Sequence, residues 1–216
     1  MTSPNPPPTK FGVVLFPGFQ ALDVFGPVDI LNILSKERAA FQLAMLAGDL
    51  EPVSTSLRSG GFGQSVVPTH TFANAPEDIE VLLVPGGVGT RHDDIIAPAV
   101  EFVRRAFPKL RFLMTVCTGS ALAAKAGVLD GKKATSNKAA FDWVTEQGPN
   151  VEWVRRARWV TDGNVWTSSG ISAGIDMMFG FVADQYGEET AQAISVRSEY
   201  RRNPDPTDDP FAALQV

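Results

Sequence analysis

The chain has 216 residues, of which 44% are hydrophobic and 20% are charged, and its formal net charge is −5. This length and composition are typical of one folded domain, and no apolar run is long enough to span a bilayer. An acidic chain lacks the basic surface that nucleic-acid binding requires. We therefore expect neither a nucleic acid nor a membrane as a partner.

The N-terminal stretch "MTSPNPPPTK" (1–10) has no apolar segment after its lysine, so it does not resemble a secretory signal. Its prolines restrain the backbone and remove hydrogen-bond donors, which predicts a disordered lead-in. Cys117 is the only cysteine and cannot form an internal disulfide. A free thiol fits a reducing compartment, so we expect a cytoplasmic protein.

Short apolar runs alternate with segments of helical spacing from residue 11 to residue 200. Strands are predicted at 11–16, 41–48, 79–87 and 111–116, and helices at 21–37, 97–107, 118–129, 137–147, 172–187 and 188–200. This alternation predicts a single α/β domain (11–200) whose mainly parallel sheet has helices on both faces.

Three further segments are less regular. Residues 48–76 are rich in Ser, Gly, Thr and Pro and predict short strands and loops, and residues 151–170 predict alternating strands around a "DGN" turn. Within the second segment, the basic "VRRARW" (154–159) is either a local basic patch or, as its alternation favours, a strand with one solvated face. Residues 201–216 form a polar, Pro-rich C-terminal tail.

Three of the predicted strands are followed by residues with unusual chemistry. Asp23 follows the first strand, Pro85-Gly86-Gly87 follows the third, and Cys117 follows the fourth. In a parallel sheet, loops at the carboxyl ends of the strands form the active site. We therefore expect these three segments to converge.

Cys117 has two interpretations. Free cysteine is often a buried apolar residue. However, a strand that enters a helix through Cys-Thr-Gly-Ser resembles a nucleophile elbow, where small residues permit a strained turn. A helix N-terminus favours the thiolate and lowers its pKa, and the Thr118 N–H is placed to stabilise an anion. We favour the reactive thiol.

Asp23 lies in "QALDVFGP" between apolar neighbours. It is either a helix N-cap or a carboxyl whose pKa is raised by apolar surroundings, so that it can donate a proton. The residues alone leave both interpretations open.

The glycine turn in "VPGGVGTR" (84–91) lacks the downstream Gly-Lys-Ser/Thr of a phosphate-binding loop. We interpret Gly86 and Gly87 as a tight turn that exposes backbone N–H groups.

"GISAG" (170–174) matches the serine-hydrolase pattern G-x-S-x-G. That fold places its histidine after the serine, whereas both histidines here precede it. We therefore predict that Ser172 is a helix N-cap and that Gly170 and Gly174 allow close backbone approach. The cysteine and histidine spacings match no zinc motif, so we expect no metal.

Four motifs together resemble the DJ-1/PfpI superfamily from about residue 11 to residue 200. They are "VLFPGFQALDVFGPVDIL", "LLVPGG", "TVCTGSALAAKAGVLDGKKAT" and "WTSSGISAGIDM". The resemblance implies a flavodoxin-like α/β sandwich, a homodimer, and one site formed by the acid, the Pro-Gly-Gly turn and the elbow cysteine.

Within that superfamily, the chain resembles the isocyanide hydratases most. That subgroup has Asp in an "LD-x-x-GP" context, Thr after the cysteine and Gly after the last strand, which correspond to Asp23, Thr118 and Gly170 beside Cys117. Many other relatives have a histidine near the position of Asn137. Asn137 cannot act as a base, which weakens any Cys-His mechanism.

The resemblance implies hydration of an organic isocyanide to an N-substituted formamide, with no cofactor. Cys117 attacks the terminal carbon and Asp23 supplies the proton. Asp23 and the Thr118 hydroxyl then guide water, while the N–H groups of Gly87 and Thr118 hold the developing charge and Gly170 provides a carbonyl contact or space. Gly86 completes the set of substrate-binding residues.

Two alternatives remain. One is a redox or ligand sensor, because a low-pKa thiol oxidises readily and similar domains precede the DNA-binding half of some AraC-like regulators. We expect no such half in a chain that ends at residue 216. The other is a DJ-1-like enzyme that acts on reactive carbonyls or on a specialised metabolite. In each enzymatic case the partner is a small-molecule substrate.

Overall fold

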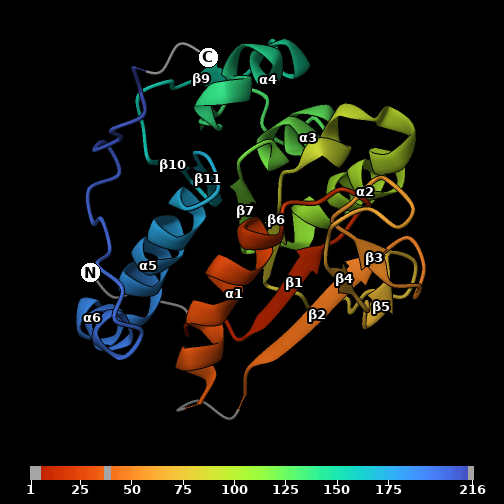
Figure 1. Cartoon of the computed structure of the whole chain (residues 1–216). Coiled ribbons are helices and arrows are strands. Elements are labelled where there is room, and N and C mark those ends of the chain that lie inside the picture. Colours follow the sequence, from red (N-terminus) through yellow and green to blue (C-terminus); the bar gives the residue numbers. More distant parts are fainter. Residues whose placement is uncertain (1–5, 37–39, 214–216) are drawn as a thin grey trace.

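The computed structural model describes residues 6–36 and 40–213, and its centre is a seven-stranded sheet (Figure 1). The strands of this sheet are β1 (Lys10–Val14), β2 (Gln42–Ala47), β5 (His70–Thr71), β6 (Val81–Val84), β7 (Phe112–Val116), β10 (Trp159–Asp162) and β11 (Val165–Ser168). Their order is β10-β11-β7-β6-β1-β2-β5. All neighbouring strands are parallel except β10 and β11, which are antiparallel.

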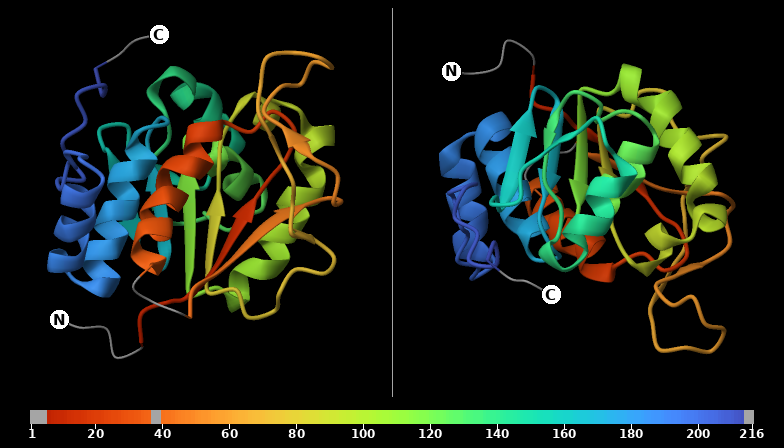
Figure 2. Two further views of the ribbon diagram at one scale, coloured as in Figure 1. Left: turned by 60° about the horizontal axis from the view of Figure 1, so that its bottom comes forward. Right: turned by 90° about the horizontal axis from the view of Figure 1, so that it is seen from above.

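Helices cover both faces of the sheet (Figure 2). One face carries α1 (Ala21–Ser35), α5 (Ala173–Tyr186) and α6 (Glu188–Arg197), and the other carries α2 (Asp93–Ala106) and α3 (Gly119–Lys125), on which α4 (Phe141–Gln147) packs. The predicted three-layer α/β architecture with a mainly parallel sheet is therefore confirmed.

Smaller elements connect the layers. Two short pairs lie outside the main sheet: β3 (Val53–Ser54) with β4 (Ser65–Val66), and β8 (Lys133–Ala134) with β9 (Glu152–Trp153). Three 3₁₀ turns are η1 (Val88–Arg91), η2 (Phe107–Lys109) and η3 (Lys138–Ala140). No helix among the described residues is long and apolar enough to cross a bilayer.

The central strands are apolar on both sides because helices cover both sides. All four residues of β6 and four of the five residues of β7 are buried, as expected for strands of a covered parallel sheet. Gly174 lets α5 approach this layer, because a Cβ there would lie 2.8 Å from a methyl carbon of Val116. The prediction of close backbone approach at Gly174 is confirmed.

The predicted strand at "VRRARW" is wrong. Residues 154–158 form an irregular connection between β9 and β10. Arg158 is buried in this connection, with its guanidinium 2.8 Å from the Asp176 carboxylate in α5, and its backbone N–H donates to the Pro206 carbonyl. The backbone N–H of Arg158 thus bonds to the tail instead of to a neighbouring strand, and its side chain is held by a buried ion pair.

The N-terminal end of the described chain is more ordered than expected, and the C-terminal tail is partly buried. Residues 1–5 of the predicted lead-in lie outside the described residues. For residues 6–10 the expectation of disorder is wrong, because the Thr9 N–H donates to the Glu80 carboxylate (2.7 Å) and Lys10 begins β1. The tail is polar, but Asp209 within it is buried.

Candidate active site

Cys117 lies between β7 and α3, at the carboxyl edge of the sheet. Its φ is +56°, a left-handed conformation that is rare and strained for a residue other than glycine. Its carbonyl accepts hydrogen bonds from the Ser136 hydroxyl (2.8 Å) and the Ser120 hydroxyl (3.0 Å). Its N–H lies 3.2 Å from the carbonyl oxygens of Ser168 and Ser169. Both sides of the elbow are thus held by serine residues.

Two glycines let the end of β6 lie against the elbow. A Cβ on Gly86 would lie 2.5 Å from the Thr118 backbone nitrogen, and a Cβ on Gly119 would lie 2.2 Å from the Val84 carbonyl oxygen. Real Cβ atoms do not approach other atoms this closely. The Pro-Gly-Gly turn and the cysteine turn therefore meet, as the sequence predicts.

Asp23 lies in the first turn of α1 and is fully buried. The N-cap position belongs to Gln20, so the N-cap interpretation of Asp23 is wrong. Its Oδ2 accepts a 2.9 Å hydrogen bond from the Gly86 N–H. Its Oδ1 is buried and has no hydrogen-bond partner among the residues that the structure describes. Burial raises the pKa of this carboxyl to about 7.

The Cys117 thiol does not have the low pKa that its position at a helix N-terminus suggested. Burial, and next the negative charge of Asp23, raise the pKa of Cys117 to about 12. The N–H groups of Thr118 and Ile171 act in the opposite direction but do not offset these effects. The sulfur therefore keeps its proton at neutral pH, and Asp23 is near enough to influence it.

The N–H groups of the Pro-Gly-Gly turn bind protein side chains. The Gly86 N–H donates to Asp23, and the Gly87 N–H donates to Thr118 Oγ1 at 3.0 Å. The expectation that the Gly87 N–H holds charge on the substrate is therefore wrong. The N–H groups that act on the sulfur are those of Thr118 and Ile171.

Thr90, in η1, is a site residue that the sequence did not indicate. Its buried hydroxyl lies 2.9 Å from Thr118 Oγ1 and 2.7 Å from the Gly87 carbonyl oxygen. Its only signal in the sequence is its position three residues after the glycine turn. Thr90 and Gly87 together fix the direction of the Thr118 hydroxyl.

Gly170 lies at the end of β11, where a Cβ would come 3.1 Å from the Cβ of Asn137. Its carbonyl oxygen accepts the Ala173 N–H, which starts the turn into α5. Ser172 occupies the N-cap position of α5, but its hydroxyl makes no capping bond and instead lies 3.2 Å from the Arg158 guanidinium. The predicted N-cap position of Ser172 is thus confirmed, although its hydroxyl does not cap the helix.

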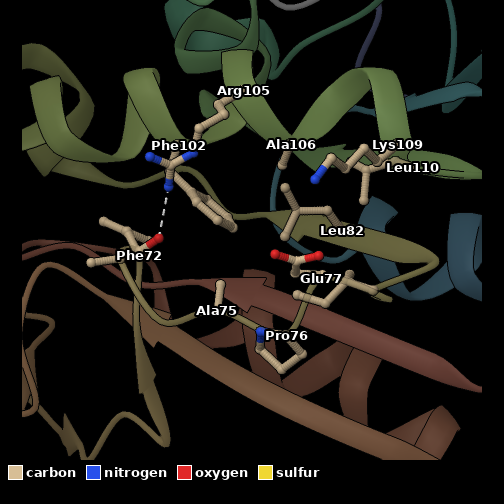
Figure 3. Close-up of a pocket in the computed structure, with 12 residues that line it drawn as sticks. Phe72, Ala75, Pro76, Glu77, Leu82, Phe102, Arg105, Ala106, Lys109 and Leu110 are labelled. Atoms are coloured by element: carbon tan, nitrogen blue, oxygen red, sulfur yellow. Dashed lines mark hydrogen bonds between the residues drawn. The ribbon is translucent and has the colours of Figure 1, made fainter.

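A separate cavity of about 240 Å³ lies between the segment before β6 and the end of α2 (Figure 3). Apolar Leu82 and Phe102 and charged Glu77, Arg105 and Lys109 line it. None of the predicted site residues is among its lining residues. Within residues 6–36 and 40–213, no group of three or more His, Cys, Asp or Glu side chains is arranged to hold a metal ion.

Comparison with known proteins shows the family to which this fold belongs. The model of the DJ-1/PfpI family matches residues 9–184. The chain belongs to the DJ-1/PfpI family. A solved structure of a ThiJ/PfpI family protein from Pseudomonas syringae has a TM-score of 0.78 and 29% identity, and the match covers 97% of this chain and 80% of that one. The predicted flavodoxin-like fold is confirmed.

Curated relatives include an enzyme and a regulator. An isonitrile hydratase from Pseudomonas putida is 34% identical over 195 residues, which are 90% of this chain and 80% of that protein. The HTH-type transcriptional regulator GbdR from Pseudomonas aeruginosa is 29% identical over 200 residues, which are 92% of this chain. The chain spans about half (52%) of the length of GbdR.

Proposed function

We propose that the protein hydrates an organic isocyanide to an N-substituted formamide, with Cys117 as the nucleophile and Asp23 as the proton carrier. The observation behind this proposal is the buried Asp23 carboxyl, which the Gly86 N–H holds where its charge acts on the Cys117 thiol. The similarity to the isonitrile hydratase of Pseudomonas putida supports the choice of substrate class.

In the first step, the Asp23 carboxylate accepts the thiol proton as the sulfur bonds to the terminal isocyanide carbon. Asp23 then passes this proton to the same carbon, which gives a thioimidate, R–N=CH–S–Cys117. A carboxyl with a pKa of about 7 is suited to both transfers near neutral pH, because it gives up and accepts a proton with similar ease. From the sequence we expect Cys117 to be a thiolate before the substrate binds. In this mechanism it is instead a thiol, which loses its proton to Asp23 as it attacks.

In the second step, water adds to the thioimidate carbon. Asp23 takes a proton from the water and delivers it to the substrate nitrogen. The C–S bond then breaks, its electron pair returns to the sulfur, and the sulfur takes the remaining hydroxyl proton as the formamide C=O forms. The N–H groups of Thr118 and Ile171 stabilise the charge on the leaving sulfur.

The remaining predicted site residues have supporting roles in this proposal. The Thr118 hydroxyl, held by Gly87 and Thr90, orients the attacking water. Gly86 holds the acid, and Gly170 lets its backbone lie close to Asn137. We further propose that the protein acts on its small-molecule substrate as a cytoplasmic homodimer without a metal or an organic cofactor.

The test is to incubate the full-length reduced protein with an aryl isocyanide and to follow the formyl proton of the product by NMR. We expect turnover by the wild type and none by Cys117→Ser, because a hydroxyl is a poorer nucleophile for this carbon. Asp23→Asn should lose most of the rate. Absence of product with an intact, reduced Cys117 would overturn the proposal.

The burial and high pKa of the thiol disfavour the redox-sensor alternative, because oxidation follows thiolate character and exposure. The similarity to GbdR keeps a ligand sensor as a second candidate. Saturable binding of the isocyanide without turnover, measured by calorimetry on the same sample, would favour that second candidate.

A further inference from the structure

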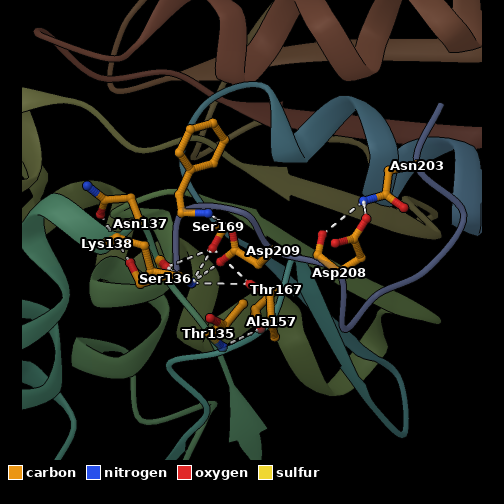
Figure 4. A network of polar contacts seen from close by, with 11 residues as sticks. Thr135, Ser136, Asn137, Lys138, Ala157, Thr167, Ser169, Asn203, Asp208 and Asp209 are labelled. Carbon is orange, nitrogen blue, oxygen red and sulfur yellow. Dashed lines mark hydrogen bonds and ion pairs between the residues drawn. The ribbon is translucent and has the colours of Figure 1, made fainter. Parts of the chain in front are cut away.

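The C-terminal segment 201–213 (the tail) runs back from α6 toward the α4 end of the molecule, where Asp209 enters the interior (Figures 1 and 4). Asp209 Oδ2 lies 2.9 Å from the Lys138 ammonium, and the two side chains are 0% and 4% exposed. Asp209 Oδ1 accepts the Phe211 N–H at 3.0 Å. Oδ1 is therefore hydrogen-bonded, whereas Oδ2 is held by the charge of Lys138 alone and has no hydrogen-bond partner among the described residues.

The Lys138 ammonium connects the tail to Ser136 and Ser169 (Figure 4). It donates to the Ser169 hydroxyl at 2.5 Å, to the Ser136 carbonyl at 3.3 Å and to the Ala157 carbonyl at 3.2 Å. These serines are the ones that hold the Cys117 backbone: Ser136 through its hydroxyl and Ser169 through its carbonyl. Asp209 is thus linked through one lysine to both sides of the cysteine.

Two further contacts of the tail reach Asp176 in α5 and the connection between β9 and β10. The Asn203 N–H donates to Asp176 (2.9 Å), and the Pro206 carbonyl accepts the Arg158 N–H (2.7 Å). Arg158 forms a buried ion pair with Asp176 and also lies 3.2 Å from the Ser172 hydroxyl, next to Ile171. The tail is therefore also linked, through Arg158, to Ser172 beside Ile171.

We propose that Asp209 in the tail is a positioning residue for Cys117. The strained φ of Cys117 persists only while its surroundings hold it. A buried ion pair adds little stability over an apolar pair of similar volume. What it adds here is position, because the negative charge of Asp209 holds the Lys138 ammonium where it donates to Ser169, Ser136 and Ala157. This inference goes beyond the proposed reaction and does not depend on the substrate being an isocyanide.

The test compares Asp209→Asn with Asp208→Asn, which makes the same change at an exposed neighbouring position. Two readouts are used: isocyanide hydration, and alkylation of the single cysteine by iodoacetamide under native conditions. For Asp209→Asn we expect kcat to fall at least about tenfold, with KM within about threefold of the wild type, because misplacement affects the reacting atoms more than binding. Alkylation should become several-fold faster as the elbow relaxes and exposes the thiol. Asp208→Asn should match the wild type in both readouts.

A double variant, Lys138→Met with Asp209→Leu, separates positioning from stability, because an apolar pair restores packing without the directed donors. We expect it to melt near the wild-type temperature while kcat stays low and alkylation stays fast. If it regains wild-type kcat and alkylation, the ion pair is only a stabiliser and the inference is overturned. If the wild type does not hydrate isocyanides, alkylation alone decides, and an unchanged alkylation rate in Asp209→Asn overturns the inference.

Discussion

The Gly86 N–H donates a 2.9 Å hydrogen bond to Asp23 Oδ2, and this bond fixes the acid against the turn that meets Cys117. It occupies one carboxylate oxygen and leaves Oδ1 without a partner among the described residues. The hydrogen bond to Oδ2 fixes the position of the carboxyl group, while the unpartnered Oδ1 can bind and release a proton. The first two predictions depend on this arrangement.

The rate of hydration should rise with pH through the pKa of Asp23. The proposed attack needs an ionised Asp23, with a pKa of about 7, and a protonated thiol, with a pKa of about 12. We therefore expect kcat/KM to increase as pH rises through about 7 and then to stay level across the alkaline range that the protein tolerates. The measurement is kcat/KM from pH 5 to pH 9.5. A rate that instead falls as pH rises through 7 would mean that Asp23 acts as a protonated acid.

Asp23→Asn should stabilise the protein at high pH. The pKa of Asp23 is raised from 3.8 to about 7 in the folded protein, so the folded state binds a proton more tightly than the unfolded state. Stability is therefore lost as pH rises from about 4 to about 7, and the loss approaches about 4 kcal/mol. Urea unfolding at pH 8 should show a gain of that order for Asp23→Asn, with little change at pH 4.

Asp29→Asn is the matched control for that prediction, because Asp29 is exposed on the same helix. Its unfolding free energy should follow the wild type at both pH values. If Asp23→Asn is no more stable than the wild type at pH 8, then ionisation of the buried Asp23 does not lower the free energy of unfolding.

The main elements of the fold were predictable because burial leaves a local pattern. β6 and β7 are continuous apolar runs since both of their faces are covered. The failure at "VRRARW" has a non-local cause: Arg158 is paired with Asp176, 18 residues further along the chain. Alternation within six residues contains no information about that partner.

The sequence predicted which residues form the site better than it predicted what each of them does. Asp23, Gly86 and Cys117 follow parallel strands, so their convergence is dictated by topology. The pKa of Cys117 was not predictable, because it depends on desolvation and on the charge of Asp23 rather than on its place at a helix end. Asp209 gave no signal, because its lysine partner is 71 positions earlier in the chain.

Loss of the Thr118 hydroxyl should lower stability and kcat more than loss of the Thr118 methyl group. In Thr118→Val, the Gly87 N–H loses its acceptor, and the buried Thr90 hydroxyl keeps only the Gly87 carbonyl as a partner. We expect a loss of about 1–3 kcal/mol in unfolding free energy and a fall in kcat of at least about tenfold. Thr118→Ser keeps the hydroxyl and should retain most of both. If Thr118→Val and Thr118→Ser have the same kcat, the Thr118 hydroxyl has no part in the mechanism.

Gly86→Ala should disrupt the site through close approach alone. The new Cβ would lie 2.5 Å from the Thr118 nitrogen and 3.0 Å from the Cys117 Cβ, so the turn or the elbow has to move. We expect a loss of about 1–3 kcal/mol in unfolding free energy, as is usual for overpacking, and a fall in kcat of about a hundredfold. Gly48→Ala is the control, because a Cβ there has no atom within 4 Å, and it should change stability by less than about 0.5 kcal/mol. A Gly86→Ala protein with wild-type kcat would show that the turn and the elbow can separate without affecting the chemistry.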